Sequence, residues 1–198
     1  MTAWISMISD QDASPELKAA LELARTPSGT VDNVMRVHSH RPSTMVGHVK
    51  LYRAALHDAS NTVPEWFQET IASYVSLINR CDYSYANHWA NARHLIGDET
   101  RAIAIEAALR AGEPQRAFSG MELAMLEYAA KLTREPGNMV EADVARMRSL
   151  GADDGQILEV NQVCGYFNYV NRLLNGLGVS LAGDVIGYYA SGKRSPQE

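Results

Sequence analysis

Hydrophobic residues recur every three to four positions along most of the chain, which is the period of an amphipathic helix. The stretch 64–79 shows this most clearly, through Trp66, Phe67, Ile71, Tyr74, Val75 and Ile78. Strict alternation of apolar and polar residues, the pattern of a half-buried strand, is rare. The pattern therefore predicts an all-α fold.

Proline and glycine divide this pattern into separate helices. The predicted helices cover 15–24, 31–38, 44–57, 64–79, 83–96, 99–111, 120–134, 140–150 and 155–177. A turn-rich segment is expected over 181–190, and residues 191–198 are expected to fray as a terminal tail. The 198 residues contain no evident linker or repeat. We therefore expect one helical domain over 1–198, with a single sizeable core.

Composition narrows the functional classes. With 46% hydrophobic and 21% charged residues the chain has ordinary globular composition. The net charge is −5 and no long Lys/Arg block exists, so we expect no nucleic-acid partner. No apolar run approaches the ~20 residues of a membrane span, and the start does not resemble a signal peptide. Only Cys81 and Cys164 are present, too few for a disulfide framework, which favours a cytoplasmic location.

Candidate chemistry concentrates between residues 69 and 88. Cys81, Ser84 and His88 are three and four residues apart, so a helix places them on one face. Cys81 falls at the predicted helix start, where the helix dipole and free N–H groups favour a thiolate. Glu69, one helix earlier, is placed to orient His88 or accept its proton. The pattern indicates a nucleophile, a base and an orienting carboxylate in one site.

This segment resembles the motif of the AhpD-like (alkylhydroperoxidase D / carboxymuconolactone decarboxylase) superfamily. That motif has a glutamate, the first cysteine of a C-x-x-C twelve residues later, and a histidine four residues beyond the second cysteine. Glu69, Cys81 and His88 match it without a gap. Segments 123–157 and 165–179 are also similar, the latter to the peroxidase-related branch, so the resemblance spans about residues 30–185. It implies an oligomeric AhpD-like helical bundle, here a homo-oligomer.

The departure from the motif is Ser84, which stands where the family has its second cysteine. In the family that cysteine is paired with the glutamate–histidine relay and attacks the peroxide. A serine hydroxyl does not cycle through sulfenic acid and disulfide. The dithiol cycle is therefore unavailable, and Cys81 would act as a one-cysteine centre reduced by an external thiol.

Three functions follow from these residues. The resemblance implies hydroperoxide reduction in antioxidant defence, with Cys81 as the redox residue and Glu69 and His88 as the proton relay. The first alternative is non-redox acid–base chemistry on a small organic acid or lactone, using Glu69 and His88. The second is a helical oligomer with a degenerate site. None of the three requires a cofactor.

Two other site types are less well supported by the spacing. Glu69, His88 and Ser84 have the composition of a hydrolase triad, but the G-x-S-x-G elbow is missing. His38, His40 and His48 raise the question of a metal site. Histidines two apart do not share a helix face and no H-E-x-x-H occurs, so no metal site is expected. We expect these histidines at helix ends, near a pocket or an interface.

The remaining notable residues are expected to be structural. Cys164 lies among apolar residues and is assigned to the core. Tyr83 and Trp89 are assigned to pocket wall or packing. Polar residues on the long apolar helix 155–177 need partners when buried, which predicts structural hydrogen bonds or an inter-subunit contact for Asn168, Asn171 and Arg172.

Overall fold

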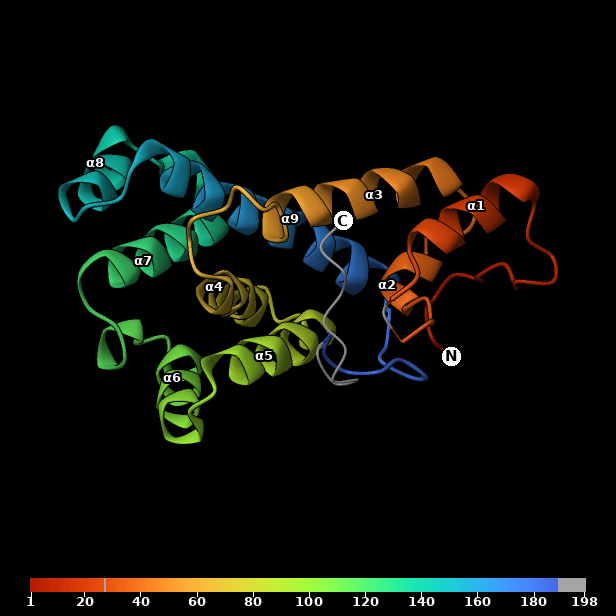
Figure 1. Ribbon diagram of the computed structural model, residues 1–198, viewed down its shortest axis with the longest axis horizontal. Coiled ribbons are helices and arrows are strands. Elements are labelled where there is room, and N and C mark those ends of the chain that lie inside the picture. The colour runs from red at the N-terminus through yellow and green to blue at the C-terminus, as the bar shows by residue number, and fades with distance from the viewer. Residues whose placement is uncertain (27, 189–198) are drawn as a thin grey trace.

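The computed structural model describes residues 1–26 and 28–188, and within them it contains helices and no strand (Figure 1). The α-helices are α1 (Pro15–Leu23), α2 (Asn33–Arg36), α3 (Pro42–Leu56), α4 (Glu65–Ile78), α5 (Asp82–Ile96), α6 (Glu99–Ala111), α7 (Gly120–Arg134), α8 (Glu141–Ser149) and α9 (Asp154–Leu177). Short 3-10 turns, η1 (Pro114–Arg116) and η2 (Pro136–Asn138), flank α7. The all-α prediction is confirmed. The expected fraying of 191–198 lies outside the described residues.

Helix α4 is the centre of the molecule. Every residue from Phe67 to Ser76 is buried, and in Figure 1 the helix runs between α5 on one side and α7 and α9 on the other. Its buried hydroxyls bond to the preceding turn, as in Ser73 Oγ to the Glu69 carbonyl at 2.7 Å and Ser76 Oγ to the Ala72 carbonyl at 2.8 Å. These local bonds give the buried hydroxyls of Ser73 and Ser76 an acceptor within their own helix, which helps α4 to be surrounded by other helices.

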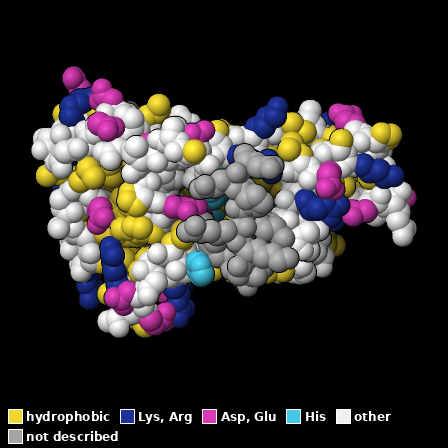
Figure 2. Space-filling model, viewed as in Figure 1, with side chains coloured by type: hydrophobic (Ala, Val, Ile, Leu, Met, Phe, Trp, Pro, Cys, Tyr) yellow, Lys and Arg dark blue, Asp and Glu magenta, His cyan; other side chains and the backbone are white. Residues whose placement is uncertain are grey.

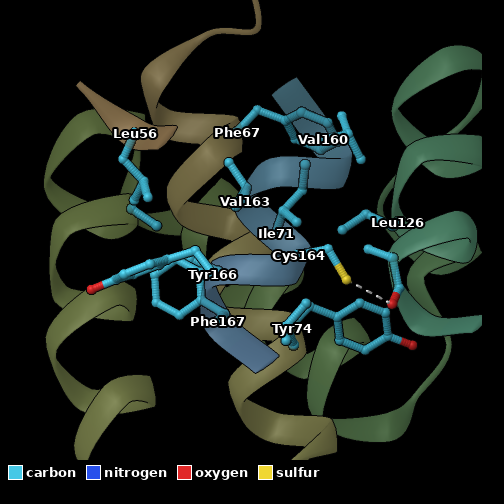
Figure 3. Packing of buried hydrophobic residues seen from close by; sticks show 14 of the residues in the cluster. Leu56, Phe67, Ile71, Tyr74, Leu126, Val160, Val163, Cys164, Tyr166 and Phe167 are labelled. Carbon is cyan, nitrogen blue, oxygen red and sulfur yellow. Dashed lines mark hydrogen bonds between the residues drawn. The ribbon is translucent and has the colours of Figure 1, made fainter. Parts of the chain in front are cut away.

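The main core forms where α4 meets α9 and α7 (Figure 3). Phe67, Ile71 and Tyr74 of α4 pack there against α9, and Leu126 reaches in from α7. Cys164 is fully buried in this cluster, with its thiol 3.4 Å from the Ala129 carbonyl. The assignment of Cys164 to the core is confirmed.

A second, smaller core joins α1 and α3 at the other end of the molecule, around Leu17, Leu21 and Met45. Helix α3 begins at Pro42, two residues before the predicted start, because proline fits the first helical turn. Arg41 before it has φ −143° and ψ 74°, a non-helical conformation. Helix α2 is shorter than the predicted 31–38, since residues 37–40 form turns.

Helix α9 ends at Gly178, whose φ of +58° suits glycine. A Cβ atom on Gly178 would lie 2.2 Å from the Trp4 ring, so a side chain there would collide with the N-terminal segment. The chain then continues as residues 181–188, which we call the return segment. This segment has turns and bends, as expected, and runs back along α5.

Hydrophobic side chains remain exposed on the surface. Ile103, Val140 and Leu158 are each 58% exposed, and Figure 2 shows hydrophobic side chains in the part of the view where α4, α6 and α7 lie. The homo-oligomer stays a prediction, and these side chains are candidates for its contacts. No helix in the described ranges has the length and apolar character needed to cross a membrane.

Candidate functional site

Glu69 of α4 and His88 of α5 form a hydrogen-bonded pair. His88 Nδ1 lies 2.6 Å from Glu69 Oε2, and Asn91 Nδ2 donates to Glu69 Oε1 at 3.2 Å. Glu69 is 0% exposed, so its carboxylate is removed from solvent and depends on these two donors. With its Nδ1 proton given to the carboxylate, His88 has Nε2 left for other chemistry.

His88 and Ser84 line a cavity of about 1320 Å³. The cavity lies between α3, α5, α9 and the return segment, and its wall carries the aromatic and histidine side chains of Tyr52, His57, Tyr83, His88, Tyr166 and Tyr188. Rings contact one another around this wall. The centroids of Tyr52 and Tyr166 are 5.6 Å apart, and those of His57 and Tyr188 are 5.8 Å apart and stacked. The space is large enough for a small organic molecule.

Ser84 is buried and belongs to a polar cluster with Ser76 and Asn171. Its Oγ lies 3.1 Å from Ser76 Oγ, which in turn contacts Asn171 of α9. No hydrogen bond between Ser84 and His88 is present in the described part of the chain. The pair needed for a serine nucleophile is therefore not formed, and Ser84 contributes a polar patch to the wall.

Cys81 lies at the N-cap of α5, one residue before the first turn in which it was expected. Its side chain is buried at 1% exposure and is not part of the cavity wall. Burial raises the pKa of the Cys81 thiol, while the backbone N–H groups of Ser84 and Tyr83 oppose this rise. Desolvation has the larger effect, so the helix start does not by itself make Cys81 an accessible thiolate.

His38, His40 and His48 lie in two places, and His48 is inside α3 rather than at a helix end as expected. His38 and His48 are buried and hydrogen-bonded to each other, with His38 Nε2 2.9 Å from His48 Nδ1. His48 Nε2 lies 2.7 Å from the hydroxyl of Tyr166 on the cavity wall. His40 is exposed and contacts Ser6. Over residues 1–26 and 28–188, no three His, Cys, Asp or Glu side chains gather as metal ligands would.

Two further carboxyl groups, those of Asp32 and Asp184, lie where the return segment approaches α2. The Tyr83 hydroxyl donates to Asp184, and the Asn33 backbone N–H donates to the same carboxylate at 3.0 Å. Burial and the nearby charge of Asp184 raise the pKa of Asp32 to about 6. Burial also raises the pKa of Asp184, although the Tyr83 hydrogen bond opposes it.

Asp32→Asn is therefore expected to stabilise the protein near pH 8 by about 2 kcal/mol and to change little near pH 4. The folded-state pKa of Asp32 is higher than its unfolded value, so stability is lost as pH rises from the unfolded pKa through the folded one. Urea denaturation of both proteins at the two pH values measures the difference. An equal gain at both pH values would contradict the titration argument.

Three further residues of the site, Asn91, Tyr52 and Tyr166, were not predicted from the sequence. Asn91 is three residues after His88 and so shares its helix face, which was a usable signal. Tyr52 and Tyr166 come from α3 and α9, and only the packing of those helices brings them to the wall. The hydrogen bonds predicted for Asn168, Asn171 and Arg172 are present, for example Arg172 Nη1 to Asn168 Oδ1 at 2.8 Å. Trp89 is buried as packing, and Tyr83 lies in the wall.

Comparison with known proteins identifies the fold. No family model matches the chain, and no curated protein matches it either. Among solved structures, an AhpD-core, uncharacterized peroxidase-related protein from Ralstonia eutropha JMP134 superposes with a TM-score of 0.78 at 19% identity, covering 91% of this chain and 92% of that one. An uncharacterized peroxidase-related protein from Silicibacter sp. TM1040 gives 0.77 at 24% identity, covering 90% and 91%.

The same architecture also occurs in the debrominase Bmp8, with a TM-score of 0.71 at 15% identity, covering 91% of each chain. The TM-scores establish the shared architecture. At these sequence identities, the chemistry has to be inferred from the residues of the site. The arrangement of α1–α9 is therefore the helical fold of the AhpD-like, peroxidase-related proteins.

Proposed function

We propose that this protein is an enzyme that moves a proton on a small organic molecule in the cavity, with His88 as the base and Glu69 as its orienting carboxylate. One observation carries the proposal: the 2.6 Å bond from His88 Nδ1 to the buried Glu69, with His88 itself at the cavity wall. A carboxylate in this position fixes the imidazole tautomer and stabilises the imidazolium that forms when Nε2 takes a proton.

The aromatic wall supports a small organic ligand, because such pockets are lined mainly by apolar and aromatic side chains with few polar groups. Solved structures of this fold carry different names, peroxidase-related protein and debrominase among them. The architecture therefore accommodates more than one chemistry, and the residues of the individual site decide between them.

The second candidate is hydroperoxide reduction in antioxidant defence, with Cys81 as the redox residue. The backbone N–H groups of Tyr83 and Ser84 near its sulfur favour this candidate. The Cys81 thiolate would attack the O–O bond, taking one oxygen as sulfenic acid and releasing an alcohol. Two equivalents of an external thiol would then return Cys81 to the thiol and release water. The reaction requires exposure of a sulfur that is now buried, so we place it second.

The experiment uses 5-nitrobenzisoxazole, whose ring opens to a coloured phenolate when a base removes its C–H proton. His88→Gln is expected to lower the rate about 10³-fold, because it removes the base and keeps a polar side chain of similar length. His40→Gln is the matched control, since His40 is an exposed histidine away from the cavity, and it should keep the wild-type rate.

Consumption of cumene hydroperoxide with dithiothreitol tests the second candidate. Peroxide consumption that disappears in Cys81→Ala, together with a ring-opening rate that is equal in wild type and His88→Gln, would reverse the order of the two candidates. A wild type no faster than buffer in ring opening would also contradict the proton-transfer proposal.

A further inference from the structure

A continuous line of hydrogen bonds leads from the cavity wall to the surface. It starts at the Tyr166 hydroxyl on α9, passes to His48 Nε2 at 2.7 Å, and continues from His48 Nδ1 to His38 Nε2 at 2.9 Å. It ends at Thr44, whose Oγ1 lies 2.8 Å from His38 Nδ1. The two histidines and Tyr166 are at most 7% exposed, whereas Thr44 is exposed. The Glu69–His88 pair is not part of this line.

The proton positions can be assigned from the Thr44 end. The Thr44 hydroxyl lies 2.8 Å from the Arg41 carbonyl, which can only accept, so its single proton is given to that carbonyl. Thr44 Oγ1 therefore accepts at its other contact, and the donor there is the N–H at His38 Nδ1.

The next assignments follow because both histidines are neutral. Burial lowers the pKa of His38, and burial together with the neighbouring His38 lowers the pKa of His48 to about 3. A neutral imidazole has one N–H. His38 Nε2 therefore accepts from the Nδ1–H of His48, and His48 Nε2 accepts from the Tyr166 hydroxyl.

This order gives Tyr166 a defined role toward the cavity. Its proton is committed to His48, so the oxygen offers only lone pairs to a ligand and requires a donor from it. The ring contacts at the wall, Tyr52 with Tyr166 at 5.6 Å among them, suit a flat aromatic ligand. A neutral ligand without an O–H or N–H group would leave the Tyr166 lone pairs without a partner.

We propose that Tyr166, His48 and His38 form a proton path, and that the cavity binds a small aromatic molecule of phenol type whose weakly acidic O–H gives its proton to Tyr166. The inference rests on the proposed function in taking this cavity as the ligand site, and it adds the ligand class and a second proton-handling group.

The transfer balances without any co-reactant. The ligand O–H bond breaks and its proton joins the Tyr166 oxygen, while the former Tyr166 proton joins His48 Nε2. The Nδ1 proton of His48 then joins His38 Nε2, and the Nδ1 proton of His38 leaves to solvent beside Thr44. At the end the Tyr166–His48 and His48–His38 hydrogen bonds are reversed, and the Thr44 hydroxyl turns from the Arg41 carbonyl to donate to His38 Nδ1. The Tyr166 hydroxyl then donates to the ligand anion, which stabilises it.

The test compares 4-nitrophenol with 4-nitroanisole, its methyl ether, which has no proton to give. In Tyr166→Phe we expect binding of 4-nitrophenol to weaken about tenfold and binding of 4-nitroanisole to change by less than about twofold. Tyr169→Phe is the control, because it removes a tyrosine hydroxyl from the same helix and leaves the path intact. Equal affinity of wild type and Tyr166→Phe for 4-nitrophenol, or no binding of it by wild type at millimolar concentration, would overturn the proposal.

A second readout follows the protons themselves. Nitrogen NMR of the ligand-free protein is expected to show His38 and His48 protonated at Nδ1, changing to Nε2 when 4-nitrophenol binds, with the absorption band of the phenolate. If the tautomers of His38 and His48 are unchanged when 4-nitrophenol is bound, the proposed proton path is also overturned. Binding and tautomers are measured without turnover, so they do not depend on His88 acting as a base. Failure here is therefore distinguishable from failure of the Glu69–His88 proposal.

Discussion

Glu69→Gln is expected to lower the ring-opening rate of 5-nitrobenzisoxazole about 10³-fold while the protein stays folded, an effect as large as removing His88. The cause is the pattern of donors around Glu69. His88 Nδ1 and Asn91 Nδ2 both donate to the carboxylate, which accepts at each oxygen. An amide at position 69 has one acceptor and one donor group, so it can satisfy only one of the two neighbours in their present state.

The amide will take the orientation that leaves its oxygen to Asn91. Asn91 cannot reverse its own amide at no cost, since its Oδ1 already accepts from the Tyr188 backbone N–H at 2.6 Å. His88 can adapt by moving its proton to Nε2, and Nδ1 then accepts from the introduced amide. The variant therefore keeps its hydrogen bonds but presents a protonated Nε2 to the cavity, where a base is needed.

Glu69→Gln/Asn91→Asp provides the matched test. A carboxylate at position 91 accepts from the introduced amide and still accepts from Tyr188, so the amide oxygen is free to hold His88 Nδ1–H again. We expect the double variant to recover a substantial part of the lost rate, and nitrogen NMR to show the His88 proton back on Nδ1. A purely structural role for Glu69 would give no recovery. A wild-type rate in Glu69→Gln alone would contradict the assigned tautomer.

Phe167→Ala is expected to lower the free energy of unfolding by about 3–5 kcal/mol. Phe167 is fully buried and lies beside Tyr166 in the core (Figure 3), with their ring centroids 5.0 Å apart. Its ring also meets the His88 ring edge-on, with centroids 4.5 Å apart. Truncation leaves a cavity between helices that cannot close without moving the central helix. Urea denaturation with a linear extrapolation measures the change.

Tyr169→Ala is the control for this measurement. Tyr169 lies two residues further along α9 and is 42% exposed, so its truncation should cost less than about 1 kcal/mol. A similar loss in both variants would mean that α9 is destabilised as a helix and that the packing of Phe167 is not the source of the effect.

Much of the fold could be predicted from the sequence because its signals are local. The bounds of α6 and α7 follow directly from the hydrophobic period and from Gly97, Gly112, Gly120 and Pro136 around them, and most other predicted boundaries agree within one or two residues. The short α2 was overestimated, because a run of apolar residues does not reveal that residues 37–40 turn to bury His38.

Only those residues of the candidate site that share one helix face could be predicted from their spacing in the sequence. Spacing placed Ser84 and His88 on one helix face, and Glu69 was proposed from the preceding helix and supported by the resemblance. Spacing did not show that Cys81 would be sealed from the cavity, since desolvation depends on what other helices place above the sulfur. The path from Tyr166 through His48 to His38 joins residues 118 and 10 positions apart, and a donor–acceptor order of that kind exists only after the helices have packed.

The return segment has a consequence for the order in which the molecule assembles. Its hydrogen bonds to Asn33 join positions 149 and 151 residues apart, and those from Gly187 and Tyr188 to Asn87 and Asn91 join positions 100 and 97 apart. Closing such long loops costs chain entropy, which is offset only when the helices that the segment contacts have already formed their docking surface. The segment should therefore dock after the helices have assembled and detach in the lowest-energy local opening. Asn91 would then lose the Tyr188 contact while still bound to Glu69, so the cavity can open before the core unfolds.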